Sequence, residues 1–370
     1  MKSATLQPIS SPRKGEAARH AIRELALSLG SGNKLPTVRE ICKSLRISAV
    51  TAENVLSGLE QDEVIIRRHG SGIYVSPRLY QQNVALVFGR NAFNPGPATF
   101  CGMIVERSQQ RAQSHNETFS FFIDTGHDST DDSVPVHSDL ASALAKGRID
   151  GMLLVARHSK LQETWLRSQN VPLVSFDGGI KPPVGPSAVA FDMEATVTLA
   201  VKELVSRGCR RLALIGTSNA SVEAFRSSLI SHGLPADTAG VVTPFTDASP
   251  TSDRTQLGRQ AMQLLAGAKP DGVIVLDDML ASGVVIELRE RGFTIGQDVL
   301  LASHVNRAAP TLASVMDQII ALEVDPDEIV ETMFKLLESQ MGKNAPPAPG
   351  VLVQPRVTAG ANVGRIAAKH

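Results

Sequence analysis

From Val84 onward the sequence alternates short apolar runs with longer amphipathic segments, and this alternation restricts the fold of most of the chain. The runs at 84–88, 151–155 and 272–276 are apolar almost without interruption. Strands of this composition are buried on both faces, as happens in parallel sheets that helices cover on both sides. The alternation comes in two successive series. We therefore predict an α/β fold with two doubly wound parallel-sheet lobes.

Each series is expected to form one lobe. Ligands of such folds bind beyond the carboxyl ends of the strands, so a ligand site is expected in the cleft between the lobes. The expected strands are 84–88, 119–123, 151–155 and 171–176 in the first series and 188–191, 211–215, 240–243, 272–276 and 299–302 in the second. The expected helices are 99–114, 138–146, 161–168, 194–207, 221–232, 253–265 and 281–291.

Residues 35–75 have a different pattern, in which two short helices precede a hairpin. Thr37 follows Pro36 and has Glu40 three residues later, which is the pattern of a capping box at a helix N-terminus. Ser48 is suited to cap a second helix, and this leaves a turn of about three residues between the two. The pattern predicts a helix-turn-helix.

The second helix of this pair should run to Leu59 and bury one face. We assign Val50, Val55, Leu56 and Leu59 to the buried stripe. The small and polar residues near its N-terminus would then be exposed and able to enter a DNA major groove. These residues are Ser48, Ala49, Thr51, Ala52 and Asn54.

A hairpin with a basic tip, called a wing, should follow the second helix. The β-rich runs 64–66 and 73–75 flank the turn sequence His-Gly-Ser-Gly at 69–72. Arg67, Arg68 and His69 would lie near the tip, within reach of a phosphate or a minor groove. An earlier helix at 15–29 is expected to pack beneath the pair through Ala18, Ile22, Leu25 and Leu29.

Residues 13–77 resemble the winged DNA-binding domain of the GntR family. The resemblance rests on Leu35-Pro36-Thr37-x-Arg39-Glu40, on Glu60, and on Ile65-x-Arg67-Arg68-x-Gly70-x-Gly72-x-Tyr74-Val75. It implies that DNA is contacted by Arg39, Ser48, Thr51, His69 and Gly70. Family members often carry arginine where this chain has Ala49 and Glu53, so the base preference should differ. The full set of candidate DNA-binding residues is Thr37, Arg39, Ser48, Ala49, Thr51, Asn54, Arg67, Arg68, His69 and Gly70.

Residues 83–363 resemble the effector-binding domain of the LacI/GalR repressors and periplasmic sugar-binding proteins. The resemblance rests on Pro-Asp-Gly-Val-Ile-Val-Leu-Asp-Asp at 270–278, on Gly283, on Leu-Arg-Glu-Arg-Gly-Phe at 288–293, and on Gly-Gln-Asp-Val at 296–299. It extends over a proline-rich crossover at 344–350 and a closing strand at 351–357. A GntR-type head on such a body is similar to the arrangement of arabinose repressors.

This second resemblance implies a ligand site built from strand ends and the loops that follow them. Aromatic faces stack on sugar C–H surfaces, and carboxylates accept hydroxyl hydrogen bonds. Relatives commonly have arginine at the position of Ser221 and aspartate at that of Val305, beside His304, which argues against a simple hexose or pentose. The candidate ligand-binding residues are Phe93, Asn94, Asp124, Asp177, Phe191, Ser221, Phe245 and Asp277.

Several of these residues also have a simpler structural interpretation. Asp277 or Asp278 would cap a helix that begins near Met279. Phe191 and Phe245 would serve equally in a hydrophobic core. Trp165 is expected to pack against its own lobe rather than stack on a ligand.

The charge of the chain is unevenly distributed although its net value is zero. Residues 1–78 hold 12 Lys and Arg against 7 Asp and Glu, which leaves 25 against 30 for the rest. A basic head on an acidic body fits a phosphate-binding module joined to a part that does not bind DNA.

Cysteine usage and hydropathy exclude several classes of protein. Cys42, Cys101 and Cys209 lie far apart and form no C-x-x-C pair, which argues against a disulfide framework and against a zinc site. The apolar runs end well short of the ~20 residues that a membrane helix requires. No hydrophobic signal region precedes residue 14, so we expect a cytoplasmic protein without membrane contact.

Enzyme motifs are weak or absent in the sequence. Asp-Thr-Gly at 124–126 matches the aspartic protease triplet, with Asp177 as a partner, but that chemistry needs a β-rich frame and these strands alternate with helices. The turn at 216–219 lacks G-x-G-x-x-G, and the sequence contains no H-E-x-x-H, G-x-S-x-G or Walker A motif. We predict no catalysis, no cofactor and no metal.

The sequence therefore predicts a DNA-binding transcription regulator, most simply a repressor, that works as a homodimer on a double-stranded operator. A small effector, a sugar or sugar derivative, would control its affinity for DNA. We expect a tail at 1–13, a winged helix-turn-helix at 14–77, a linker at 78–83 and a bilobed body at 84–370. The alternatives are a small-molecule binding protein whose head contacts protein, and an α/β enzyme.

Overall fold

The computed structural model describes residues 12–89, 92–93, 95–115, 117–124, 138–155, 158–180, 184–237, 239–244, 253–341 and 346–366. The chain divides into two compact units, each described by itself below. The first unit comprises Met1–Val84, Ala112–Ser120 and Asp139–Asp150, and the second comprises Ala85–Arg111, Phe121–Ser138 and Gly151–His370.

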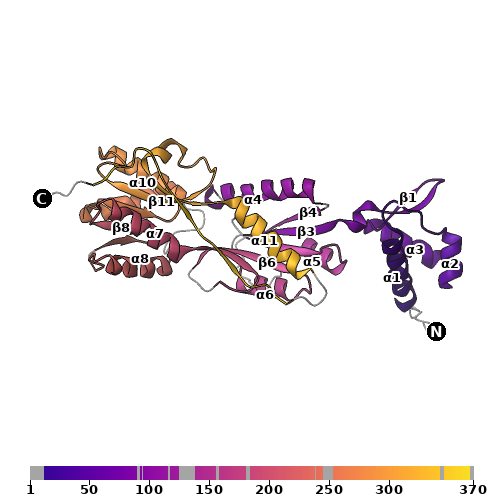
Figure 1. The fold of residues 1–370 in the computed structure, drawn as a ribbon. Helices are drawn as coiled ribbons and strands as arrows, with labels where there is room; N and C mark the ends of the chain where they lie inside the picture. The colour runs from indigo at the N-terminus through magenta and orange to yellow at the C-terminus, as the bar shows by residue number, and fades with distance from the viewer. Residues whose placement is uncertain are drawn as a thin grey trace, which may run out of the picture. The chain divides into compact units, whose positions relative to one another are not determined.

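The N-terminal part of the first unit, which we call the head, is a helix-turn-helix followed by a wing (Figure 1). Its helices are α1 (Pro12–Leu29), α2 (Val38–Leu45) and α3 (Ala49–Gln61). The wing is an antiparallel hairpin of β1 (Ile65–Arg68) and β2 (Gly72–Val75), in which Ile65 pairs with Val75. The short 3-10 helix η1 (Pro77–Tyr80) follows it.

The core of the head confirms the expected helix pair, but the buried faces of α1 and α3 differ from those that we predicted. On α1 the buried residues are Ala18, Ile22 and Ala26, whereas Leu25 and Leu29 are exposed. The buried set repeats every four residues, so it forms the face that packs on α3, and Leu25 and Leu29 lie beside that face. Both leucines were assigned to the core because they are apolar and lie at three- and four-residue spacing, and that assignment was wrong.

The buried stripe of α3 also differs by one residue from the expected one. It consists of Ala52, Val55, Leu56 and Leu59, which follow the spacing of one helical face. Val50 is 71% exposed, and Ala52 is buried rather than exposed. Val50 precedes Val55 by five residues, and this spacing turns it away from the core.

The first sheet of the α/β body has six strands in the order β13-β7-β6-β5-β3-β4. The pairs β5–β6, β6–β7 and β7–β13 are parallel. The strands are β3 (Gln82–Phe88), β4 (Glu117–Ile123), β5 (Gly151–Val155), β6 (Leu173–Ile180), β7 (Ala188–Asp192) and β13 (Val351–Val353). The associated helices are α4 (Pro95–Ser114), α5 (Ser138–Ala145), α6 (Lys160–Arg167) and α11 (Pro326–Gln340).

The second sheet has the order β14-β12-β11-β10-β8-β9, and all its pairs are parallel except β12–β14. Its strands are β8 (Leu212–Ile215), β9 (Gly240–Val242), β10 (Gly272–Val275), β11 (Leu300–Asn306), β12 (Ile320–Val324) and β14 (Arg356–Ala359). Its helical elements are α7 (Met193–Ser206), α8 (Asn219–Ser231), α9 (Arg254–Leu265), α10 (Asp278–Glu290), η2 (Ala266–Ala268) and η3 (Ala313–Gln318).

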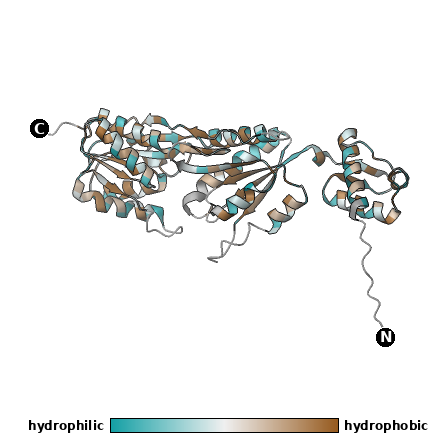
Figure 2. Ribbon diagram, turned by 90° about the horizontal axis from the view of Figure 1, so that it is seen from below, coloured by the Kyte–Doolittle hydropathy of each residue, from teal (hydrophilic) through white to brown (hydrophobic). Residues whose placement is uncertain are grey.

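Both faces of the second sheet are buried, as the apolar runs predicted. Val273 and Val275 of β10 pack in one core with helices α9 and α10, and Ile274 packs in the opposite core with α7 and α8. The strands of both sheets are correspondingly hydrophobic in Figure 2. The expected doubly wound α/β fold with two parallel-sheet lobes is confirmed.

The chain crosses between the two sheets three times, and the sequence pattern did not reveal this. β7 was expected in the second series but lies in the first sheet, and Asp192 at its end caps α7 of the second. β12 and α11 were not anticipated at all. The expected closing strand at 351–357 is two strands, β13 and β14, one in each sheet. No helix among the described residues is long and apolar enough to cross a membrane.

Candidate DNA-binding and ligand-binding sites

The first helix of the helix-turn-helix begins at a capping box. The backbone N–H and the hydroxyl of Thr37 both donate to the Glu40 carboxylate at 2.8 Å, and the Glu40 N–H donates to Thr37 Oγ1 at 3.3 Å. These hydrogen bonds from Thr37, the backbone one first, lower the pKa of Glu40. Arg46 ends the helix in the left-handed conformation (φ 51°) and so turns the chain toward α3. Arg39, on the first turn of this helix, is exposed.

Ser48 caps α3, as expected. Its hydroxyl accepts the Thr51 N–H at 3.1 Å, and the two hydroxyl oxygens lie 2.8 Å apart. The exposed residues of α3 are Ala49, at its first position, Gln61, at its last, and the outward stripe, which we define as Val50, Glu53, Asn54 and Ser57. The predicted reading residues Ser48, Ala49 and Asn54 are therefore exposed, whereas Thr51 is half-buried.

The tip of the wing carries exposed basic side chains. Gly70 (φ 69°) and Gly72 (φ 124°) take backbone conformations that favour glycine, and they close the hairpin. The Arg68 guanidinium lies 4.8 Å from the centre of the Tyr74 ring, which holds it at the wing surface. His69 is exposed beside it.

Arg67 occupies a different position from the other wing cations. Its guanidinium pairs with Glu53 of α3 at 2.5 Å and with Glu60 at 3.4 Å, and its backbone N–H donates to Glu60. The pairing fixes the wing against α3 and neutralises much of the arginine charge. The sequence did not indicate this role, because Glu53 lies fourteen residues before Arg67.

Lys34 is a candidate DNA contact that sequence reasoning missed. It pairs with Tyr74 through an isolated β-bridge, and its Nζ lies 5.9 Å from the centre of the Tyr74 ring. Lys34 and Arg68 therefore share one aromatic support on the wing. Its only signal in the sequence is a lysine just before the Leu35-Pro36-Thr37 motif.

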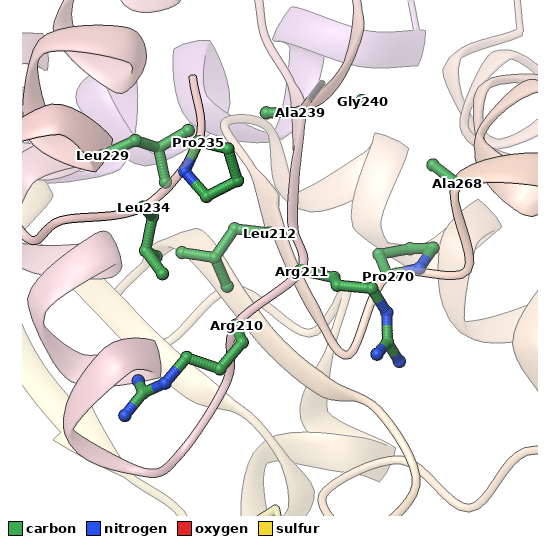
Figure 3. Close-up of a pocket in the computed structure, with 10 residues that line it drawn as sticks. All are labelled: Arg210, Arg211, Leu212, Leu229, Leu234, Pro235, Ala239, Gly240, Ala268 and Pro270. Atoms are coloured by element: carbon green, nitrogen blue, oxygen red, sulfur yellow. The ribbon is translucent and has the colours of Figure 1, made fainter. Parts of the chain in front are cut away.

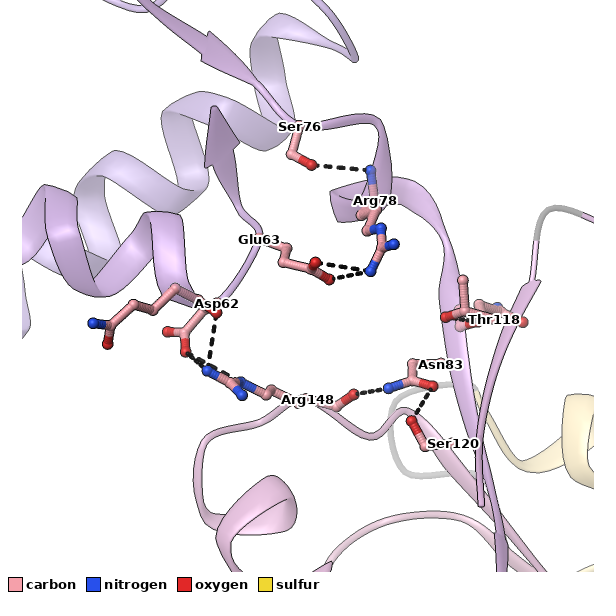
Figure 4. A network of polar contacts seen from close by, with 10 residues as sticks. Asp62, Glu63, Ser76, Arg78, Asn83, Thr118, Ser120 and Arg148 are labelled. Atoms are coloured by element: carbon pink, nitrogen blue, oxygen red, sulfur yellow. Dashed lines mark hydrogen bonds and ion pairs between the residues drawn. The ribbon is translucent and has the colours of Figure 1, made fainter. Parts of the chain in front are cut away.

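A polar network joins the end of α3 to other parts of the first unit (Figure 4). Asp62 pairs with Arg19 of α1 and, at 3.1 Å, with Arg148, whose guanidinium also donates to the Gln61 carbonyl at 2.9 Å. The carbonyl of Arg148 in turn accepts the Asn83 side-chain amide at 2.7 Å. Asp62, Asn83 and Arg148 border a cavity of about 520 Å³, which Arg78, Ser120 and Asp150 also line.

The ends of two strands in the first sheet carry predicted ligand residues. Asp124 follows β4, where its N–H donates to the Phe88 carbonyl and its carboxylate accepts from the Gln162 amide at 3.1 Å. Phe93 is exposed, and its ring centre lies 5.0 Å from that of Phe88. The two predicted residues thus flank the end of β3. Asp177 is exposed on β6 at a register shift, and Asn94 lies outside the described residues.

An aromatic cluster connects the two sheets of the body. Phe191, at the end of β7, lies with its ring centre 5.2 Å from Phe176 and 6.2 Å from Phe100. On the other side it lies 5.1 Å from the His304 ring of β11 in the second sheet. Phe191 therefore packs in an aromatic cluster near the carboxyl end of β7, and its part in ligand binding stays a prediction.

Asp277 lies at the carboxyl end of β10 and caps α10. Its carboxylate accepts the N–H groups of Met279 and Leu280 at 3.0 and 2.9 Å, and it pairs with Arg254. The capping interpretation therefore applies to Asp277, and Asp278 is the first residue of the helix. An arginine in contact with a strand-end carboxylate was not anticipated.

Two titratable groups near Asp277 have shifted pKa values. Burial lowers the pKa of His304, while the charge of Asp277 and a hydrogen bond with Asn306 oppose that shift. Burial and the neighbouring Asp277 raise the pKa of Asp278 to about 6, against hydrogen bonds that include the side chains of Asn306 and Thr311. The pKa values of Asp278 and His304 therefore depend on the charge of Asp277.

Two predicted ligand residues remain, Ser221 and Phe245. Ser221 is fully buried, and its hydroxyl donates to the Ser218 carbonyl at 2.6 Å inside a capping box of α8. Phe245 lies outside the described residues. A separate cavity of about 230 Å³ lies at the amino ends of β8, β9 and β10, opposite the predicted site, and Arg210, Arg211 and Pro270 line it (Figure 3).

The described residues contain no cluster of His, Cys, Asp or Glu that would hold a metal ion. Burial raises the pKa of the Cys101 and Cys209 thiols to about 12, so neither supplies a thiolate at neutral pH.

Two protein families match this chain. The profile of "Bacterial regulatory proteins, gntR family" matches residues 15–75, and that of "Periplasmic binding protein-like domain" matches residues 201–362. Both describe regulatory or binding proteins rather than enzymes. No curated protein matches the chain.

Three solved structures with the same fold have titles that name transcription regulators. A LacI transcriptional regulator from a Rhodococcus species superposes with a TM-score of 0.60 at 20% identity, over 77% of this chain and 100% of that one. A ribose-bound LacI family regulator from Enterococcus faecium gives 0.59 at 19%, over 77% and 100%. The regulator CelR in complex with cellobiose gives 0.57 at 18%, over 85% and 91%. At these identities the likeness establishes the fold.

Proposed function

We propose that this transcription regulator, which joins a gntR-family DNA-binding domain to a periplasmic binding protein-like domain, binds operator DNA through α3 and the wing and binds a small effector at the strand ends of its body. The observation that carries the DNA half is the arrangement of the head. A capped helix-turn-helix and a wing that bears Arg68 and His69 supply both a major-groove helix and phosphate contacts.

Binding to DNA through these surfaces makes a testable electrostatic claim. Exposed cations that replace counterions along DNA give an affinity that falls linearly with the logarithm of salt concentration. Arg39→Ala and Arg68→Ala should each weaken operator binding and each reduce the salt slope by about 0.9. If affinity and slope are unchanged in both variants, the head binds something other than DNA, such as another protein.

The effector half of the proposal is supported by the groups gathered at strand ends of both sheets. Phe191 offers an aromatic face, and Asp277 and His304 offer polar atoms beside it. Ribose and cellobiose are named with two structures of the same fold, so we propose a hydroxylated effector, a sugar or sugar derivative. Arg254 beside Asp277 extends the range of effectors to acidic or phosphorylated sugars.

A thermal-shift screen tests the effector. Sugars, sugar acids and phosphorylated sugars are added to the full-length protein, and a ligand at 100 times its Kd stabilises the native state by about 2.7 kcal/mol. Asp277→Asn should remove that shift. A screen in which no member of these classes raises the Tm would contradict the proposed ligand class.

We further propose a cytoplasmic homodimer that recognises a near-palindromic operator with half-sites about one helical turn or more apart. Effector binding would change the geometry of the dimer and hence its operator affinity, and by linkage the operator would change effector affinity by the same factor. We propose that the uninduced protein represses transcription. Sedimentation of the protein with one operator checks the stoichiometry of two chains per site.

A further inference from the structure

The first turn of α3 exposes an apolar side chain that the fold of the head does not use. Val50 is 71% exposed, and it heads the outward stripe of α3 formed with Glu53, Asn54 and Ser57. Buried residues of the same helix occupy the opposite face. A β-branched side chain at an exposed helical position also has a lower helix propensity than alanine. Val50 therefore lies outside the core of the head and favours the helix less than alanine would.

The Ser48 and Glu53 side chains, which lie on either side of Val50 in the sequence, are engaged with other protein groups. The Ser48 hydroxyl caps the helix and contacts the Thr51 hydroxyl at 2.8 Å. The Glu53 carboxylate, one turn beyond Val50, pairs with Arg67 at 2.5 Å. The exposed side chains at the very start of α3 are therefore those of Ala49 and Val50, and Asn54 is an exposed polar side chain one turn further along the helix.

The chemistry of the major groove identifies what such a surface recognises. Thymine is the only standard base that presents a methyl group there, and apolar side chains read it by contact. Guanine and adenine are read instead by arginine, lysine, asparagine or glutamine side chains that form paired hydrogen bonds. Neither Ala49 nor Val50 can form such bonds.

We propose that Val50, assisted by Ala49, is a specificity-determining residue that selects thymine in the operator by packing on its C5-methyl group. This inference rests on the proposed DNA-binding function and specifies which base the head prefers. The Glu53 carboxylate, held by Arg67 one turn away, only accepts hydrogen bonds and so has no donor for the N7 and O6 acceptors of guanine. Val50 therefore favours thymine, and Glu53 offers no competing hydrogen bond to guanine.

The size of the effect follows from the area that becomes buried. Each methylene or methyl group removed from water contributes ~0.8 kcal/mol, which is about a fourfold change in affinity. A single thymine methyl in contact with Val50 is therefore expected to be worth about fourfold.

The experiment begins with selection of binding sites from random duplex DNA by the full-length protein. In the selected operator each thymine is then replaced singly by deoxyuridine, which removes only the C5-methyl group. Affinities of the wild type, Val50→Ala and Val50→Ile are measured for both DNAs. Leu264→Ala is the matched control, because Leu264 on α9 is 74% exposed and also loses an apolar side chain.

The inference predicts about fourfold weaker binding of wild type and of Leu264→Ala to one deoxyuridine operator. Val50→Ile should retain that ratio, and in Val50→Ala it should fall below about twofold. Any effect of deoxyuridine on the DNA itself cancels, because all variants are compared on the same pair of duplexes. A ratio that is near one in the wild type, or unchanged in Val50→Ala, overturns the inference. If selection enriches no sequence at all, the proposed function fails instead.

Discussion

The cations of the DNA-binding head lie on its surface, whereas the charged and titratable groups at the strand ends of the body are largely withdrawn from water. Arg39 and Arg68 are exposed, and Arg68 rests on an aromatic ring. In the body, His304 is buried, and Asp277 is held by Arg254 and two backbone N–H groups. Exposed charges interact over a distance that salt shortens, whereas buried charges respond to protonation and to direct contact. The two regions should therefore respond to different perturbations.

Salt and the exposed arginines should produce the largest difference between the regions. For a protein that makes six to ten phosphate contacts, operator affinity falls by about 10³ to 10⁵ between 50 and 200 mM salt. Arg39→Ala and Arg68→Ala should each weaken operator binding further, and each should reduce the salt slope by about 0.9. Effector affinity measured by calorimetry should change little in either experiment. An effector affinity that falls as steeply as operator affinity would remove the contrast between head and body.

The helix pair α9–α10 allows the stability of the body to be changed alone. A Cβ at Gly283 would collide with the Thr255 carbonyl and the Arg259 backbone, so Gly283→Ala forces the helices apart. Overpacking of this kind costs about 1–3 kcal/mol or more. Urea unfolding should show the loss, with DNA binding by the folded protein retained. Gly102→Ala is the control, since Gly102 lies in α4 with open space around it and the exchange should stabilise by about 0.5–1 kcal/mol.

The stability of the body should depend on pH through the titration of Asp278. Its pKa rises from 3.8 to about 6 in the folded protein, so the folded state keeps a proton that the unfolded state loses, and stability falls as pH rises from about 4 to 6. Asp278→Asn should remove that loss and raise the free energy of unfolding by about 1–2 kcal/mol at pH 7.5, but not near pH 4. Asp139→Asn, at an exposed position, serves as the control.

The titration of His304 should change the stability with pH in the opposite direction. Its pKa is lowered from 6.5, so the unfolded state binds a proton more readily and stability falls as pH drops below 6.5. Denaturation of Asp278→Asn across this range should therefore reveal a decline toward acid that the wild type partly masks. An Asp278→Asn gain that is equal at pH 4 and pH 7.5 would show that burial does not perturb this carboxyl.

The smallest expected effect concerns the capping box of the head. Thr37→Ala removes the hydroxyl that accepts the Glu40 N–H, and loss of such a cap costs about 1 kcal/mol. Amide hydrogen exchange in α2 should accelerate while exchange in the sheets of the body does not change. Uniform acceleration would mean that the head has no separate stability.

In the head, the sequence predicted the helix caps and the wing turn better than it predicted which helical residues are buried. The cap at Thr37, the cap at Ser48 and the glycines of the wing involve residues within a few positions of each other. Val50 was assigned to the core because it is apolar, although its spacing of five residues from Val55 turns it away from the buried face. The pairing of Arg67 with Glu53 was missed because it joins two elements, and no local pattern specifies such a contact.

In the body the alternation of strands and helices predicted the layers but not which strand enters which sheet. β7 and β13 belong to the first sheet only because the chain crosses between sheets, and nothing in their composition indicates this. The same reasoning applies to the site. Arg254 with Asp277, and Phe191 with His304, are pairs of residues from separate elements that only the tertiary fold brings together.

The most direct test measures operator affinity of the full-length protein by fluorescence anisotropy with and without an effector found in the thermal-shift screen. A saturating ligand that raises the Tm should change the operator Kd by about 5- to 150-fold, and the operator should change the Kd of that ligand by the same factor. A ligand that stabilises the body but leaves the operator Kd unchanged at saturation would contradict the coupling of the two regions.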